Sequence, residues 1–353
     1  MPRFKKKELI MTKSSRRQSW IDCIRGIGII LVVLAHYIHG DNPLCKWISS
    51  FHMPLFFILS GILIAMHEAY ADKPLRSVLL RRAKQLLYPY LTFSILIIIY
   101  YLLRGRPDTA SKVFYYTFTL EGHNTMWFLP ALWMAECILL VLLRSRIPDL
   151  ASTIVLLLGT TIYAALQYYV IGGAVPADEG LHYLILNGLC RSGIGSIYMM
   201  AGYKGYLLRT KFANLKKHTL RLCAAAAFVS GIFLGYINAS VDLHYCALSN
   251  PLLYYLAALL QCSGLIVFCA VTVQRSALLE FFGRSSLIIM ATHYPLPVIN
   301  LAQYMLQNLS TGMRYADALI GCSLVMLFEA VLILIINRYC PFLLRMPVTD
   351  RSR

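Results

Sequence analysis

The stretch from Ser19 to Gly40 reads SWIDCIRGIGIILVVLAHYIHG and is apolar enough to span a bilayer, yet it contains an arginine and a histidine. Arg25 and His36 stand eleven positions apart. On an α-helix, eleven residues return the chain to within about 20° of the same face and about 16 Å further along the axis. The two side chains are therefore predicted to lie on one stripe at two depths. Ionisable groups inside a membrane span are costly and by default mark function.

The composition of the 353 residues supports a membrane setting for this stretch. Hydrophobic residues make up 58% of the chain and charged residues 14%, with a mean hydropathy of +0.63. This leaves too little polar content for a soluble protein of this size. Apolar runs of about 17 to 25 residues predict an all-α integral membrane protein with about ten transmembrane helices in one bundle. These spans lie near residues 21–40, 50–69, 83–103, 126–143, 150–171, 189–208, 219–238, 251–273, 285–304 and 316–337.

The net charge of +17 would also suit a protein that binds nucleic acid, but its distribution favours another explanation. With the amino terminus inside, most of the 33 Lys and Arg residues fall in cytoplasmic segments, as the positive-inside rule describes. Nucleic acid is not needed, and both termini are predicted to be cytoplasmic. Residues 1–19 are expected to form a basic amino-terminal segment, 20–340 one membrane domain and 341–353 a short basic tail. The ten cysteines show no C-x-x-C pair, so we expect neither a metal site nor a disulfide framework.

Two histidines are expected to approach each other near the outer side of the membrane. His36 lies about 22 Å from the cytoplasmic edge of a hydrocarbon core about 30 Å thick. A histidine at this depth either bonds a neighbouring helix in its neutral form or carries a function. His52 opens the segment FHMPLFFILSG after a short connection, so it returns at the same outer side. It is either an ordinary interfacial histidine or part of a site with His36.

A basic run follows the second predicted span. Arg81, Arg82 and Lys84 precede a Tyr-Pro-Tyr sequence at the start of the third span. Such a run is usually a topology signal, and it can equally grip phosphate groups from the cytosol.

Three further polar or aromatic residues within the spans are candidates for supporting roles. Glu136 can orient a histidine or an acceptor hydroxyl, or it can be a neutral acid bonded between helices. Trp127 can stack against a sugar, or it can be an ordinary interfacial aromatic residue. His293 precedes a Pro-Leu-Pro sequence where a helix can break, so it can line the acceptor side.

Several of these motifs together resemble the membrane acyltransferase-3 family, and most closely its sugar O-acetyltransferase branch of the fucose 4-O-acetylase type. They are R-x10-H on the first helix, FHMPLFFILSG, the basic run before YPY, WFLPALW at residues 127–133, and residues 283–295 with their late histidine. The resemblance implies a ten-helix enzyme that takes acetyl groups from cytosolic acetyl-CoA and delivers them to hydroxyls of surface or lipid-linked glycans.

The resemblance also assigns roles to particular residues. The family's essential histidine falls on His36, its arginine on Arg25, and its basic pair on Arg81 and Arg82. Many members carry a further arginine just before the third-helix proline, where this chain instead has Lys84 and three uncharged residues.

The chemistry of the residues agrees with this assignment. Neutral imidazole suits a base that removes a hydroxyl proton near neutral pH, so His36 is the candidate base. Coenzyme A is anionic at its nucleotide end and carries its thioester on a long arm. Arg25 and the basic run would hold the donor, and the distance of about 16 Å from Arg25 to His36 is comparable to the reach of that arm.

The predicted activity is therefore O-acetyl transfer from acetyl-CoA, a cosubstrate, to a carbohydrate hydroxyl. We expect the chain in a bacterial inner (plasma) membrane. The alternative is a secondary transporter or a glycan flippase, because helices with buried charges also describe a solute pathway. A third possibility is an enzyme of the same fold with another acceptor, such as peptidoglycan, a lipid or a small molecule.

Overall fold

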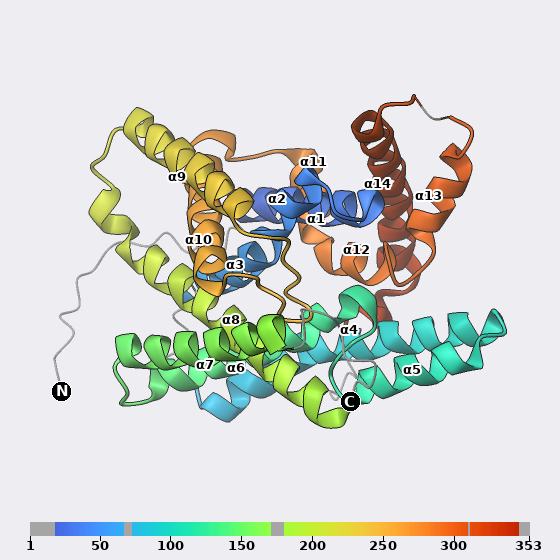
Figure 1. The fold of residues 1–353 in the computed structure, drawn as a ribbon, viewed down its shortest axis with the longest axis horizontal. Helices are drawn as coiled ribbons and strands as arrows, with labels where there is room; N and C mark the ends of the chain where they lie inside the picture. Colours follow the sequence, from blue (N-terminus) through green and yellow to red (C-terminus); the bar gives the residue numbers. More distant parts are fainter. Residues whose placement is uncertain (1–17, 67–72, 171–179, 310, 346–353) are drawn as a thin grey trace, which may run out of the picture.

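The computed structural model describes residues 18–66, 73–170, 180–309 and 311–345, and within these ranges the chain is helical with no strand (Figure 1). The longer helices are α1 (Ser19–Ile38), α3 (His52–Met66), α4 (Leu75–Leu103), α5 (Pro107–Phe118), α6 (Phe128–Arg144), α7 (Asp149–Val170), α8 (Leu181–Leu208), α9 (Lys217–Ile237), α10 (Pro251–Phe268) and α14 (Arg314–Tyr339). The shorter ones are α2 (Pro43–Ser49), α11 (Ala277–Arg284), α12 (Ser286–Thr292), α13 (Val298–Leu306) and the single turns η2 (Asn124–Trp127), η3 (Arg209–Phe212), η4 (Cys269–Val273) and η5 (Pro341–Leu343). Most of the two predicted basic end segments lies outside the described residues.

Eight helices of the described ranges are long and apolar enough to cross a membrane. They coincide with eight of the ten predicted spans, and they establish an all-α membrane protein. The predicted sixth span falls on α8, which is 28 residues long but carries polar residues such as Asn187, Arg191 and Ser196. These residues lower its hydropathy, so α8 is not among the eight.

The predicted ninth span is wrong as a single helix. Residues 285–304 form α12 and α13, of seven and nine residues, with a break between them. Pro295 and Pro297 lie in this break, where each lacks the N–H that a continuing helix requires. At about 1.5 Å per residue, neither piece is long enough to cross a hydrocarbon core about 30 Å thick.

The centre of the molecule is formed by α1 and α3, with α4 to α7 along one side and α13 with α14 at one end (Figure 1). α1 packs on α11 and α14, and α3 packs on α8. Both α1–α11 and α3–α8 meet backbone to backbone through glycines. A Cβ at Gly26 would collide with the Leu279 carbonyl, and one at Gly61 with the Met199 carbonyl. Close approach through small residues is the usual way in which membrane helices gain packing energy.

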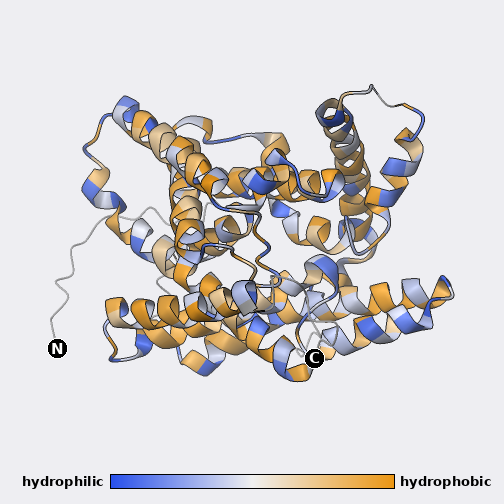
Figure 2. Ribbon diagram, in the orientation of Figure 1, coloured by the Kyte–Doolittle hydropathy of each residue, from blue (hydrophilic) through white to orange (hydrophobic). Residues whose placement is uncertain are grey.

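The faces that point away from this centre are apolar (Figure 2). Side chains such as Val155 on α7, Phe233 on α9 and Leu334 on α14 are exposed. In water such a surface would aggregate, whereas lipid chains cover it without cost. The exposed apolar faces therefore agree with a membrane environment.

Two glycines on α8 allow a direct test of the α3–α8 contact. A Cβ at Gly202 would meet the Ile58 carbonyl, whereas nothing lies within 4 Å of a Cβ at Gly205. We expect Gly202→Ala to lower the melting temperature in detergent, because the helices must separate and overpacking costs about 1–3 kcal/mol. Gly205→Ala is the matched control and should be neutral or slightly stabilising, since alanine favours the helix. Equal melting temperatures for the two variants would contradict the close α3–α8 packing.

Candidate functional site

One cavity of about 760 Å³ follows α1 along much of its length. Its lining runs from Arg25 to Gly40, a rise of about 22 Å along the helix. Arg25, Ile29, Val32 and His36 all line it, as the helical spacing predicts. The volume is within the range of about 300–1,000 Å³ that is usual for small-molecule sites.

The two ends of this cavity have different walls. Arg284 and Ser286, which flank the α11–α12 junction, line the end at Arg25. Lys112 of α5 and Asp242, in the loop between α9 and α10, also line the cavity, as does His39 at the carboxyl end of α1. By the topology predicted from charge, the first end belongs to cytoplasmic segments and the second to outer ones. The cavity thus joins segments that the sequence assigns to opposite sides of the membrane.

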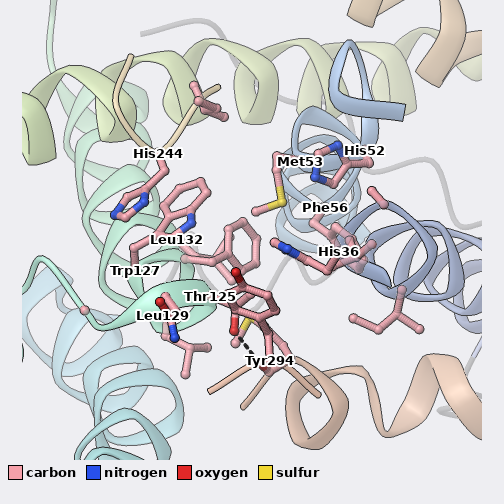
Figure 3. A pocket seen from close by; sticks show the side chains of 18 of the residues that line it. His36, His52, Met53, Phe56, Thr125, Trp127, Leu129, Leu132, His244 and Tyr294 are labelled. Atoms are coloured by element: carbon pink, nitrogen blue, oxygen red, sulfur yellow. Dashed lines mark hydrogen bonds between the residues drawn. The ribbon is translucent and has the colours of Figure 1, made fainter. Parts of the chain in front are cut away.

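His36 lies between these ends, beside two rings from the segment that follows α12 (Figure 3). The centroid of its ring is 4.7 Å from that of Tyr294 and 5.3 Å from that of His293. Neither ring nitrogen of His36 hydrogen-bonds another described residue. Both nitrogens therefore remain available to a molecule in the cavity.

His293 is fully buried at the carboxyl end of α12. Its Nδ1 lies 2.6 Å from the Ile289 carbonyl oxygen, which can only accept, so Nδ1 carries the hydrogen. Its Nε2 then has a lone pair and no partner among the described residues. Next to it, the Thr292 hydroxyl lies 2.7 Å from Glu329 Oε2, which ties α12 to α14.

His52 begins α3 and also lines the cavity. Its Nδ1 lies 2.8 Å from the Ile48 carbonyl oxygen at the end of α2, so its other nitrogen is the one free to act as an acceptor. The turn before it starts from Asn42, whose side chain accepts a hydrogen bond of 2.9 Å from the Cys45 N–H, with Pro43 at the first helical position. An Asn cap followed by proline is a strong helix start, and it places His52 on the cavity wall with His36.

The basic run of α4 is divided between two environments. Arg81 and Lys84 line a groove together with Arg76 and Arg345. Arg82 instead contacts both carboxylate oxygens of Glu136 of α6, with Nε 2.6 Å from Oε2 and Nη2 2.5 Å from Oε1. Glu136 is 1% exposed. It is thus an ionic partner of Arg82 and does not line the cavity of His36.

Trp127 lines the cavity across from His36, within a polar cluster whose other members the sequence did not single out (Figure 3). His244 stacks on its ring at 5.4 Å between centroids and an angle of 9°. Arg191 of α8 lies 5.4 Å from the same ring and forms a buried ion pair with Glu121, at 2.8 Å. His244 Nε2 lies 3.0 Å from the same carboxylate oxygen. We call Trp127, Glu121, Arg191 and His244 the outer cluster.

The loop that holds Glu121 shows how burial and charge compete. Burial raises the pKa of Glu121, but the contact with His244 and the charge of Arg191 outweigh this, so the pKa lies below its ordinary value. Burial lowers the pKa of the neighbouring His123 to about 4, with smaller contributions from Lys112 and His244. At neutral pH the cavity wall therefore holds an uncharged His123, and the ionised carboxylate of Glu121 lies buried behind it.

The sequence matches the family described as an acyltransferase domain, acyltransferase-3, over residues 18–342. This match covers nearly all of the chain. The protein belongs to the acyltransferase-3 family. No curated protein and no solved structure matches it. The family is one of membrane acyltransferases, which makes acyl transfer the activity of this chain and leaves the donor and acceptor to be assigned.

The Arg82–Glu136 pair gives a prediction about stability. Arg82→Ala leaves a buried carboxylate without its cation, which typically costs about 3–5 kcal/mol, less here because Arg82 is 23% exposed. The melting temperature should fall clearly. Arg81→Ala on the neighbouring position removes only a groove cation and should leave it unchanged. If the two variants melt alike, Arg82 does not act as a structural partner of Glu136.

Proposed function

We propose that this acyltransferase moves acetyl from cytosolic acetyl-CoA to a hydroxyl of a surface or lipid-linked glycan, with His36 as general base. The observation that carries the proposal is one cavity in which His36 stands between an end lined by Arg25 and Arg284 and an end lined by His39 and Asp242. The proposed setting is a bacterial inner membrane with both termini in the cytoplasm. The full bundle would then include α8 and the broken α12–α13 pair.

The donor is proposed to enter at the end of the cavity lined by Arg25. Coenzyme A presents phosphates, which arginine and lysine bind well. Arg25 and Arg284 line that end of the cavity, and Arg81 and Lys84 line the nearby groove of α4. Leu86, two residues beyond Lys84, lines the cavity itself, so groove and cavity lie along the same helix. Phosphates held at these cations would leave the thioester arm to follow α1 toward His36.

The proposed reaction is a single displacement. A ring nitrogen of His36 takes the proton of the acceptor hydroxyl while the hydroxyl oxygen attacks the carbonyl carbon of the thioester. A carbon–oxygen bond forms, the carbon–sulfur bond breaks, and the departing thiolate receives the proton back from His36. The unpartnered Nε2 of His293 can accept a hydrogen bond from the other nitrogen of His36 once that ring is charged. His293 would then orient the base and stabilise its cation.

The activity is tested with purified protein in lipid, radiolabelled acetyl-CoA and a glycan extract of the cell envelope. Label in the glycan supports the proposal. Movement of glycan across the membrane without label transfer would instead indicate a transporter or flippase. Mass spectrometry of the labelled glycan then identifies the acceptor.

In this assay we expect His36→Ala to lower kcat/KM by about 10²–10⁴-fold, the usual contribution of a general base. Because His36 has no hydrogen bond to a described residue, the substitution should leave the melting temperature near normal. His218→Ala on the exposed side of α9 is the control and should retain full activity. A well-folded His36→Ala protein with full activity would exclude this mechanism.

The cavity also predicts the direction of transfer. In oriented vesicles, acetyl-CoA should be used only on the face that bears the termini, with label appearing on glycan enclosed on the opposite face. Vesicles in which the protein has the reverse orientation provide the control. In these vesicles acetyl-CoA should be used only from the opposite side of the membrane. If donor and a membrane-impermeant acceptor must be supplied on the same face, the route through the membrane is wrong.

A further inference from the structure

The loop between α9 and α10 holds His244 in a fixed place. Asp242 and Ala247 exchange two backbone hydrogen bonds of 2.9 Å, which closes a short turn around it. The Asp242 side chain accepts a further bond of 2.8 Å from the His244 N–H. Cys246 and Leu248, which follow, are fully buried. The loop is thus anchored into the helical domain.

Side chains of α8 hold this turn in place through hydrogen bonds to its backbone. The His244 carbonyl accepts hydrogen bonds from Asn187, at 2.8 Å, and from Arg191, at 3.3 Å. Arg191 is 1% exposed and also donates to the backbone carbonyls of Leu120 and Glu121. One guanidinium therefore joins the loop of His244 to the loop of Glu121. The contacts to His244 are made to its backbone, so they do not depend on its side chain.

The charge of Glu121 selects the tautomer of His244. Glu121 is bound to Arg191, and its pKa lies below the ordinary value, so the carboxylate is ionised and can only accept. His244 Nε2 lies 3.0 Å from Oε1, off the straight line of an ideal hydrogen bond. A hydrogen on Nε2 is favoured next to this negative charge. The lone pair of neutral His244 is then on Nδ1.

Nδ1 is the accessible nitrogen of this ring. Nε2 is buried, whereas Nδ1 is not, and Nδ1 has no hydrogen-bond partner among the described residues. His244 lines the cavity, and Trp127 fixes the plane of its ring. Across the cavity lies His36 (Figure 3). A fixed acceptor of hydrogen bonds thus lines the wall opposite the proposed base.

His244 differs from the other histidines that line the cavity, which are His36, His39, His52 and His123. Within the described residues none of those four forms an ion pair with a carboxylate. A histidine paired with a buried carboxylate has both its ring orientation and its tautomer fixed, which a merely space-filling histidine does not require. This arrangement leaves Nδ1 of His244 as the ring nitrogen available to a ligand.

We propose that His244 is a binding residue for the acceptor, whose Nδ1 accepts a hydrogen bond from one hydroxyl while another hydroxyl reacts at His36. The inference rests on the proposed function and narrows its substrate class to polyhydroxylated acceptors, such as sugars with at least two free hydroxyls. Glu121 and Arg191 are then positioning residues, which hold His244 in place.

The test compares two substitutions at this position in the same transfer assay, with the labelled glycan fraction as acceptor. His244→Phe keeps a flat ring against Trp127 but removes the nitrogen. His244→Asn keeps an amide oxygen that can lie close to the Nδ1 position. For His244→Phe we expect the KM for the glycan to rise about tenfold, the scale of one lost hydrogen bond, with the KM for acetyl-CoA unchanged. His244→Asn should recover most of the loss.

The control is His218→Asn, at an exposed histidine of α9 that does not line the cavity, and its KM values should change less than about twofold. An unchanged glycan KM in His244→Phe overturns the inference while the proposed function stands. A fall in melting temperature with equal rises in both KM values also overturns it, because it assigns His244 a structural role. If the wild-type protein transfers no label, the proposed function itself fails and this inference with it.

Discussion

Burying a polar group away from water costs free energy unless it finds a partner, and this cost governs where charge sits within these helices. Arg82 meets Glu136, Arg191 meets Glu121, and each pair joins two segments distant in sequence. At the end of the cavity lined by Arg25, Asp22 lies 3.2 Å from Arg284, which also contacts Glu280. His36 has no such partner among the described residues. Its cost is offset only by the cavity, which is why the unpaired histidine and the hollow space occur together.

The low hydropathy of α8 and the fixed position of the turn that carries His244 have the same cause. Asn187 and Arg191 make α8 too polar to rank among the apolar spans, and the same two side chains hold the turn that carries His244. Replacing them with leucine would give a more ordinary membrane helix and leave the loop carbonyls without donors. The polar residues of α8 thus support the cavity wall from behind, although no residue of α8 lines the cavity.

Local periodicity was sufficient to predict eight of the spans and the cavity wall that α1 provides. The eleven-residue spacing of Arg25 and His36 predicts that both face one way, and both line one cavity. The prolines after His293 indicate a break, and the chain breaks there. Pairings over long separations were beyond such reasoning. Glu136 gave no sign that Arg82 was its partner, 54 positions away.

Apart from Trp127, the outer cluster was missed for the same reason. Glu121 and His244 lie in two different loops, and only the folded chain brings them together. Each of these two residues looked ordinary alone. A signal was present in the loop itself. The sequence VDLHYCAL at residues 241–248 is unusually apolar for a solvated connection, and its apolar members are the ones that anchor His244.

The two walls of the cavity are related to each other through α8. This helix meets α3 backbone to backbone at Gly61 and Gly202, and α3 begins with His52 on the wall of His36. Further along the same helix, Arg191 holds the loops of Glu121 and His244. A rigid helix in contact with both walls fixes the distance between the proposed base and the proposed acceptor contact. Acyl transfer demands this, because reacting groups held about 1 Å out of place can lose about a hundredfold in rate. The glycines of α3 and α8 do not line the cavity themselves, but their close contact helps to hold its walls in place.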